Sequence, residues 1–424
     1  MVVAGIGNLL PPLATLAIAP VLAQTLGVVG RGELAAATAP YLLALSIATL
    51  GIPEALTQTV ARFPSLARVL LPRATWIVAL AGIVASAAIA LAAPLLSRGS
   101  SELAILIIIA AVATAPALVI SVLRGLASGL HAWKSVALER ALSGAFKAVP
   151  VIILASTSHL TAMTATVCLA FAPVLAGVAY VGLRRITPKQ ISGSETHRPR
   201  FRALLSYGFR TWIGSISGIL LLRVDQVLMT PLSSAYQLGL YAVAVNVSEV
   251  PLIVNTAVRE VMFSADASDN DDKKLSAAAR ISSLICVIIA GLLIGTVAFW
   301  LPFLFGMDFV EAIPVAVVLI FAVALGVPGS IAGSGLSARG RPELRSLSIL
   351  IACVVNIGLI FVLVPTWGAL GAAVATLCGN LLSSNGNIYF AQRFLGISWT
   401  SFYGIRRSDL SILRTLLVRL LTRA

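Results

Sequence analysis

Long apolar runs constrain this sequence more than any other feature. A bilayer hydrocarbon core of about 30 Å needs roughly 20 apolar residues in one helix. Runs of that length lie near residues 2–26, 34–60, 74–97, 103–127, 136–155, 160–183, 204–230, 238–262, 277–303, 311–336, 345–365 and 369–394. With 59% hydrophobic and only 11% charged residues, the chain of 424 residues has more apolar side chain than one water-soluble core can bury. We therefore predict an all-α integral membrane protein with 12 transmembrane helices.

The sequence also repeats itself at an offset close to half its length. The glycine of GRGELAAA recurs 207 residues later in QLGLYAVA, as Gly32 and Gly239. Gly125-Leu126-Ala127 recurs after 210 residues as Gly335-Leu336-Ser337, and LTAMTATVC (160–168) recurs at the same offset as LGAAVATLC (370–378). Three matches at nearly one offset indicate an internal duplication. We expect two pseudo-symmetric lobes of six helices each.

A hydrophilic stretch, RRITPKQISGSETHRPRFR, separates the two copies. The predicted organisation is an N-terminal lobe (1–183), a basic cytoplasmic linker (184–203), a C-terminal lobe (204–395) and a basic amphipathic cytoplasmic tail (396–424). A disordered basic tail is the alternative to the amphipathic helix. The N-terminal run lacks the basic stretch of a cleaved signal peptide, so we interpret it as the first membrane span.

Positive charge alternates with the predicted topology. Of the 30 Lys and Arg residues, 19 lie in the loops after even-numbered runs or in the tail and nine lie inside the runs, whereas the odd-numbered loops hold only Arg31 and Arg98. Because cytoplasmic loops carry the excess of Lys and Arg, both termini are predicted to be cytoplasmic. This placement explains the net charge of +14 without a nucleic-acid partner. Two homologous bundles of one orientation are typical of a transporter with a central cavity between its lobes.

Cysteine and histidine residues show no pattern of a metal site. The four cysteines, Cys168, Cys286, Cys353 and Cys378, all fall inside apolar runs and form no C-x-x-C motif. The three histidines, His131, His159 and His197, are scattered and have no second ligand in helical register. We expect no metal and no cofactor.

Two phrases of the sequence carry a family resemblance. TLGVVGRGELAAATAP (25–40) precedes LGIPEALTQTVAR (50–62), and LLRVDQVLM (221–229) precedes LGLYAVAVNVSE (238–249). They resemble the polysaccharide flippases of the multidrug/oligosaccharidyl-lipid/polysaccharide exporter superfamily. The resemblance implies a MATE-like fold working by alternating access. It implies transfer of an undecaprenyl-diphosphate-linked oligosaccharide from the inner to the outer leaflet of a bacterial cytoplasmic membrane, with glycosyltransferases and a polymerase of the same pathway as partners.

Ionisable residues inside the apolar runs are the candidates for function. Each costs roughly 2.5–3.5 kcal/mol near the bilayer centre on insertion scales, and such residues mark substrate or ion pathways by default. Lys147 lies near the middle of the fifth run and Glu249 near the middle of the eighth, with Asn246 on the same helical face as Glu249. Buried ion pairs are the alternative role. Glu54, Asp225 and Arg210 lie nearer the interfaces, so structural roles are favoured for them.

The substrate that the resemblance implies would need a cationic site. Arg140, Ser143 and Lys147 share a helical face, and Arg223 shares one with Gln226. Lys147, Arg140 and Arg223 are therefore predicted to hold the diphosphate. Glu249, Asn246 and Gln226 are predicted as polar or coupling residues of the cavity. The last run is unusually polar, so its Asn380, Asn385 and Asn387 are predicted to face the wet interior with the sugars, and interhelical packing is the alternative.

Other functions remain open at this stage. A cation-coupled multidrug exporter would share the fold; such relatives often use an acid in the first helix, which this chain lacks, although Glu54, Asp225 or Glu249 could substitute. Lipid-II-type flippases carry two further helices. A membrane enzyme acting on lipid-linked sugars needs an outer catalytic loop, but the longest candidate offers only Asp308 and Glu311 without a base. A non-transporting scaffold is the last alternative.

Overall fold

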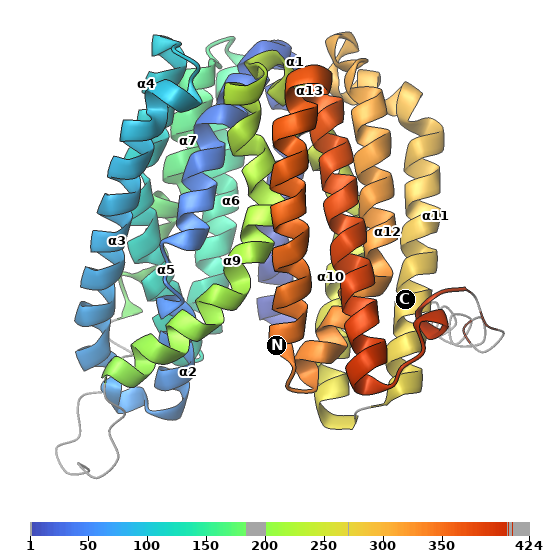
Figure 1. Ribbon diagram of the computed structural model, residues 1–424. Helices are drawn as coiled ribbons and strands as arrows, with labels where there is room; N and C mark the ends of the chain where they lie inside the picture. The colour runs from blue at the N-terminus through green and yellow to red at the C-terminus, as the bar shows by residue number, and fades with distance from the viewer. Residues whose placement is uncertain (1, 184–200, 270, 405, 407–408, 410–424) are drawn as a thin grey trace, which may run out of the picture. The chain divides into compact units, whose positions relative to one another are not determined.

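The computed structural model describes residues 2–183, 201–269, 271–404, 406 and 409, and the elements found in them are helices (Figure 1). The first part of the chain forms α1 (Val2–Ile47), α2 (Ile52–Arg62), α3 (Ala67–Leu96), α4 (Ser101–Val112), α5 (Thr114–Gly129), α6 (Trp133–Ser156) and α7 (Ala162–Ala176). The second part forms α9 (Phe201–Leu232), α10 (Ala235–Asp269), α11 (Asp272–Phe305), α12 (Ala312–Ala338) and α13 (Pro342–Leu395). Short 3-10 turns include η2 (Gly177–Tyr180) and η4 (Trp399–Phe402).

Two of these helices are interrupted by a glycine. α1 bends at Gly27, with φ of 65°, and α13 bends at Gly368, with φ of 54°. Left-handed backbone of this kind favours glycine, which has no Cβ. Gly27 follows the first predicted run and Gly368 lies between the last two, so the sequence located both breaks.

The prediction of an all-α membrane protein is confirmed. Within the described residues, seven helical segments are long and apolar enough to cross a membrane. Two of the corresponding helices, α3 and α11, expose large apolar side chains: Trp76, Leu91, Phe299 and Phe303 are each more than three-quarters exposed. Lipid can cover such surfaces at no cost, whereas water cannot. The count of twelve spans stays a prediction.

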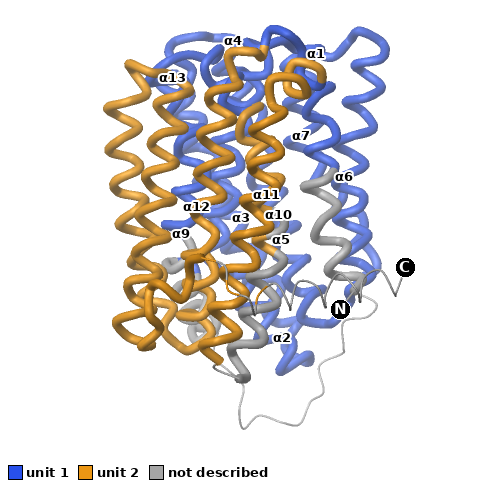
Figure 2. Tube along the Cα trace, turned by 90° about the vertical axis from the view of Figure 1, so that its right-hand side faces the viewer, with its two compact units in different colours: residues 1–242, 304–308 blue, residues 243–303, 309–424 orange. Residues whose placement is uncertain are grey.

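The chain divides into two compact units (Figure 2). Unit 1 comprises residues 1–242 and 304–308, and unit 2 comprises residues 243–303 and 309–424. The predicted lobe boundary at residues 184–203 therefore differs from the boundary between the compact units, because α9 packs against α1, α2 and α3. One of the contacts is a hydrogen bond of 2.6 Å from Trp212 Nε1 to the carbonyl oxygen of Ile47. The division into repeat lobes remains a prediction from the sequence.

The glycine pair of the sequence repeat makes a backbone contact inside unit 1. A Cβ on Gly32 would lie 1.7 Å from the carbonyl oxygen of Ala235, and one on Gly239 would lie 2.0 Å from that of Val28. The same added atoms would lie 2.9 Å and 3.2 Å from the backbone nitrogen of the other glycine. Neither position can hold a side chain. The two repeat-equivalent glycines thus let the start of α10 and the middle of α1 approach at backbone distance.

Each unit has its own apolar core. In unit 1, Leu56 of α2, Val78 of α3 and Leu126 of α5 belong to one buried cluster. In unit 2, Leu275 of α11 and Phe402 of η4 belong to another, together with side chains of α12 and α13. The unit 1 core holds α2 and α5 in fixed positions. Those two helices form part of the cavity described next.

Candidate functional site

A cavity of about 630 Å³ opens within unit 1. Helices α1, α2, α5, α6 and α7 contribute its walls, and the volume falls in the range of small-molecule sites. Its lining combines leucine and proline side chains with charged and hydroxyl groups. The charged members are Glu54, Arg124, Glu139, Arg140 and Lys147. Five ionisable side chains around one cavity inside a membrane domain make it the strongest candidate for the functional site.

A partly buried ion pair joins two of the cavity helices. Arg124, near the end of α5, donates from Nε to Glu139 Oε2 at 3.0 Å and from Nη2 to Glu139 Oε1 at 2.9 Å. Glu139, in the second turn of α6, is 1% exposed, and the Tyr180 hydroxyl donates to it at 3.5 Å. Both carboxylate oxygens thus accept hydrogen bonds. The forked geometry fixes the Arg124 guanidinium and neutralises Glu139.

Close packing of α2 and α5 positions this pair. A Cβ on Gly125 would lie 2.5 Å from the carbonyl oxygen of Pro53, so only glycine allows the approach. The Thr57 hydroxyl donates to the carbonyl oxygens of Pro53 and Gly125, each at 2.9 Å. Gly125 follows Arg124 in the chain and Pro53 precedes Glu54, so these contacts join the two backbones beside the charged residues. The wall between the two charged residues is therefore rigid.

Two cations on α6 remain unneutralised. Arg140, Ser143 and Lys147 all line the cavity, as their shared helical face predicts. Arg140 and Lys147 are half-buried, and neither forms an ion pair with any residue that the structure describes. They lie two helical turns apart, about 10.5 Å along the axis. An unpaired cation in a site of lowered dielectric attracts an anion more strongly than one in water.

One acid faces these cations across the cavity. Glu54 of α2 lines it, is exposed, and has no ion pair within the described part of the chain. Because Arg124 and Glu139 neutralise one another, the unpaired charges of the lining are two cations and one acid. The cavity therefore favours an anionic ligand.

The predicted candidates on α9 lie elsewhere. Arg223 is half-buried and is absent from the described residues that line the cavity. Asp225 is buried, accepts a hydrogen bond from the Gln226 backbone nitrogen at 2.7 Å, and accepts another from the Tyr241 hydroxyl of α10. Asp225 thus ties α9 to α10, the structural role favoured by its position. The Arg210 side chain lies outside the described residues.

The predicted polar residues of α10 belong to unit 2. Glu249 is exposed. Asn246 is half-buried, and its Nδ2 is a buried donor without a hydrogen-bond partner among the described residues. A buried donor left unpaired is unfavourable, so Asn246 is available to a ligand or a water molecule.

The polar stripe of α13 packs against glycines of α12. The Gly329 nitrogen donates to Ser384 Oγ at 3.1 Å, and Asn387 Nδ2 donates to the Gly329 carbonyl oxygen at 3.1 Å. Asn380 lies beside Gly326, and Asn385 is exposed. Ser384 and Asn387 thus serve interhelical packing, the alternative to lining a wet interior.

Sequence reasoning missed the cavity residues Arg124 and Glu139, and it missed Tyr180, which donates to Glu139. A signal for the first two was present: opposite charges 15 residues apart flank the short turn between two apolar runs. Helices joined by a short turn pack antiparallel, so residues equally far from the turn face each other. Tyr180 carries no comparable signal.

The structure offers no assembled metal site in the part of the chain that it describes. There, no group of three or more His, Cys, Asp or Glu side chains is arranged to hold an ion. The four cysteines are free thiols, and Cys286 and Cys353 are buried. The described lining of the unit 1 cavity offers Lys, Arg, Glu and hydroxyl groups.

The chain is similar in sequence to a probable glycan biosynthesis flippase, and in fold to a multidrug transporter and a lipid II flippase. A probable low-salt glycan biosynthesis flippase, Agl15 of Haloferax volcanii, is 25% identical over 206 residues, which are 47% of this chain and 43% of that relative. The match thus spans less than half of that relative's length.

Two solved structures share the fold. An inward-facing MATE family multidrug transporter of the MOP superfamily superposes with a TM-score of 0.69 at 16% identity, covering 92% of this chain and 98% of the other. The lipid II flippase MurJ, in an inward closed conformation, superposes with a TM-score of 0.65 at 14% identity, covering 99% and 97%. The predicted MATE-like fold is confirmed.

A family model described as polysaccharide biosynthesis protein matches residues 1–264, a stretch that includes α1 to α7 and all the residues of the unit 1 cavity. The chain belongs to this family of polysaccharide biosynthesis proteins.

Proposed function

We propose that this chain flips an undecaprenyl-diphosphate-linked oligosaccharide from the inner to the outer leaflet of a bacterial cytoplasmic membrane by alternating access. The observation that carries the proposal is the presence of two unneutralised cations, Arg140 and Lys147, in the unit 1 cavity. Membership of the polysaccharide biosynthesis family and similarity to a glycan biosynthesis flippase support the substrate class.

The lining residues divide the work of holding such a substrate. Lys147 presents a compact charge and Arg140 a planar fork, and both suit phosphate oxygens. Arg124, held by both oxygens of Glu139, contributes a neutral pair to the lining and leaves the net positive charge to Arg140 and Lys147. The lipid chain would stay in the bilayer while the charged group crosses in the cavity. Roles for Arg223, Gln226, Glu249, Asn246 and the asparagines of α13 in holding the glycan stay predictions, because this cavity includes none of them.

The same proposal places the protein in a pathway. The chain performs no covalent chemistry on the glycan, receives its substrate from glycosyltransferases on the cytoplasmic side and releases it to a polymerase outside. Both termini and the linker at 184–203 are then cytoplasmic, in accord with the distribution of Lys and Arg.

A second candidate function has one observation in its favour. Glu54 is an acid without an ion pair among the described residues, and it lines the same cavity. A carboxylate in that place could exchange a proton or sodium ion, as a cation-coupled multidrug exporter requires. In that case Glu54→Gln would abolish drug tolerance. A glycan flippase that binds its substrate through the cations of α6 would instead lose more polymer export on replacement of Lys147 than on replacement of Glu54.

A complementation experiment tests the proposal. A deletion strain expressing Lys147→Glu should fail to export polymer, because the substitution places repulsion where the diphosphate must bind. Lys134→Glu is the matched control: it makes the same charge change on α6 at an exposed position outside the cavity. Polymer export by Lys147→Glu at the wild-type level would reject the cationic site. Loss of tolerance to cationic dyes on deletion, with normal polymer, would favour the exporter.

A further inference from the structure

A second cavity, of about 460 Å³, lies in unit 2 between the first turns of α11 and the segment that follows α13. Its α11 side presents Lys273, Lys274, Ser276 and Arg280, and its other side presents Ser398, Ser401 and Arg406. Four of these seven residues are cations. The cavity is separate from the unit 1 site and shares no residue with it.

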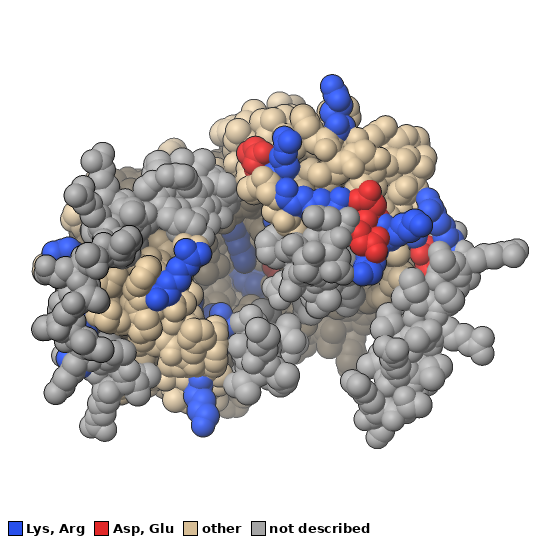
Figure 3. Space-filling model, turned by 90° about the horizontal axis from the view of Figure 1, so that it is seen from below, with Lys and Arg blue, Asp and Glu red and all other residues tan. Residues whose placement is uncertain are grey.

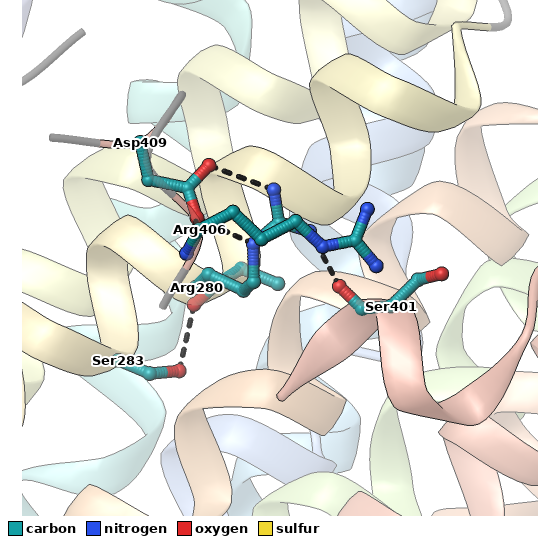
Figure 4. A network of polar contacts seen from close by, with 6 residues as sticks. Arg280, Ser283, Ser401, Arg406 and Asp409 are labelled. Atoms are coloured by element: carbon teal, nitrogen blue, oxygen red, sulfur yellow. Dashed lines mark hydrogen bonds and ion pairs between the residues drawn. The ribbon is translucent and has the colours of Figure 1, made fainter. Parts of the chain in front are cut away.

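The floor of this cavity is a closed network (Figure 4). Arg280, 5% exposed, donates from Nε and Nη2 to the two oxygens of Asp409 at 2.6 and 2.7 Å, and from Nη1 to the Ser401 carbonyl oxygen at 2.6 Å. Asp409, 2% exposed, also accepts from the Arg406 backbone nitrogen at 2.9 Å. The Arg280–Asp409 pair neutralises itself and holds the segment after α13 against α11.

The acids at the mouth are also engaged. Asp272 pairs with Arg339 at 2.5 Å. Asp271 caps the start of α11 by accepting from the nitrogens of Lys273 and Lys274 at 2.9 and 3.1 Å, and it lies 3.8 Å from the Lys274 ammonium. The first N–H groups of the helix are thus already satisfied, so an anion here would bind to side chains.

Two cations of the lining remain unpaired. The side chains of Lys273 and Arg406 form no ion pair with any described residue. Both are exposed members of the lining. The view from below shows Lys and Arg side chains on that face of the molecule, some of them beside acids (Figure 3). The cavity therefore carries uncompensated positive charge at its opening, above a neutral floor.

Exposed aromatic side chains stand beside this charge. Trp399 and Tyr403, on the segment that forms one side of the cavity, are 56% and 39% exposed and contact each other edge to face at 6.4 Å. Trp and Tyr concentrate at the headgroup level of a membrane, where one end of the ring is apolar and the other wet. Neither ring lines the cavity, but both lie on the segment 396–406 that supplies Ser398, Ser401 and Arg406 to it. A basic cavity with an exposed Trp-Tyr pair on the same chain segment fits the surface of an anionic leaflet.

We propose that this cavity binds the phosphate-bearing headgroup of an anionic phospholipid, held by Lys273 and Arg406 at its mouth with Trp399 and Tyr403 at headgroup depth. The bound lipid bridges α11 and the segment after α13, the two elements that the Arg280–Asp409 pair already joins. This inference does not depend on the glycan or on the unit 1 cavity.

The test uses the purified full chain in detergent micelles supplemented with dioleoylphosphatidylglycerol, dioleoylphosphatidylcholine or inorganic phosphate. Phosphatidylglycerol should raise the unfolding temperature of the wild-type protein at concentrations where the other two do not. The apparent affinity for phosphatidylglycerol should be at least tenfold weaker in Lys273→Glu/Arg406→Glu, and should fall with added salt. The control Lys134→Glu/Arg393→Glu makes the same charge change at exposed positions outside both cavities and should bind as the wild type does.

Equal affinity in the cavity variant and the control would overturn the site. An equal shift with inorganic phosphate would overturn the lipid assignment, because the glycerol and acyl parts of the lipid would then contribute nothing. If the double variant fails to fold, the single Lys273→Gln variant, judged by the ratio of phosphatidylglycerol to phosphatidylcholine retained in native mass spectrometry, decides the same question.

Discussion

Replacement of Lys147 offers the sharpest perturbation of the proposed diphosphate site. The residue lines the unit 1 cavity on the same face of α6 as Arg140 and has no ion pair among the residues that the structure describes. Removing its charge therefore leaves no described acid without its ion-pair partner. This distinguishes Lys147 from Arg124, whose loss would leave Glu139 buried and unpaired.

The size of the effect follows from the charges. A hydrogen bond to a charged group contributes about 1.5–3 kcal/mol, so Lys147→Ala should weaken diphosphate binding by about 10- to 150-fold. Lys147→Glu adds repulsion: two unit charges 4 Å apart at an effective dielectric constant of 20 interact by about 4 kcal/mol. The two terms together predict a loss of more than about 1000-fold.

The assay is equilibrium binding of a short-chain, water-soluble polyprenyl-diphosphate oligosaccharide to the purified protein, by isothermal titration calorimetry. Lys134→Glu serves as the control for the change in net charge, since Lys134 is exposed on α6 outside the cavity. The order wild type, Lys147→Ala, Lys147→Glu should hold for the dissociation constants. A Lys147→Glu protein that binds within threefold of the wild type would refute the reasoning.

Three further predictions concern stability. Arg124→Met should destabilise the protein by about 3–5 kcal/mol because it leaves the buried Glu139 uncompensated, whereas Arg124→Met/Glu139→Leu should recover most of that loss in thermal unfolding. Gly32→Ala should lower the unfolding temperature strongly because its Cβ would overlap the Ala235 carbonyl, whereas Gly291→Ala, with nothing within 4 Å, should not. Arg280 holds the pKa of Asp409 below its ordinary value; the Arg280–Asp409 pair therefore stabilises the protein above the unfolded-state pKa of about 3.9 and is lost as pH falls through the lower folded-state value. The protection of the backbone amides in residues 397–404 against hydrogen exchange should thus stay high from neutral pH down to about pH 4 and fall below it. In Asp409→Asn this protection should already be low at neutral pH.

The sequence predicted those features that depend on local pattern. Apolar run length predicted an all-α membrane protein, and the helical period placed Arg140, Ser143 and Lys147 on one face of α6, where all three line the cavity. Repeat matching singled out Gly32 and Gly239, which contact each other. Each of these inferences uses residues that are near in sequence or equivalent by duplication.

The sequence did not predict features that depend on which helices pack together. The density of polar residues in α13 suggested a wet face, but Ser384 and Asn387 hydrogen-bond to the backbone of Gly329. Whether polar residues of α13 face water or another helix is decided by α12. There, Gly326, Gly329 and Gly333 form a stripe of small residues that leaves room for the polar side chains of α13. Likewise, Arg223 is as charged as Lys147, yet the packing of α9 leaves it outside the cavity lining described for unit 1.

The most direct measurement of the central claim is transbilayer movement in proteoliposomes. A fluorescent undecaprenyl-diphosphate oligosaccharide would be added to vesicles containing the purified chain, and the fraction protected from a membrane-impermeant quencher would be followed over time. The wild-type and Lys134→Glu proteins should both equilibrate the lipid between leaflets, whereas Lys147→Glu should leave it on the side where it was added. Movement at the wild-type rate in Lys147→Glu, or none in the wild type, would contradict the proposed transport through a cationic cavity.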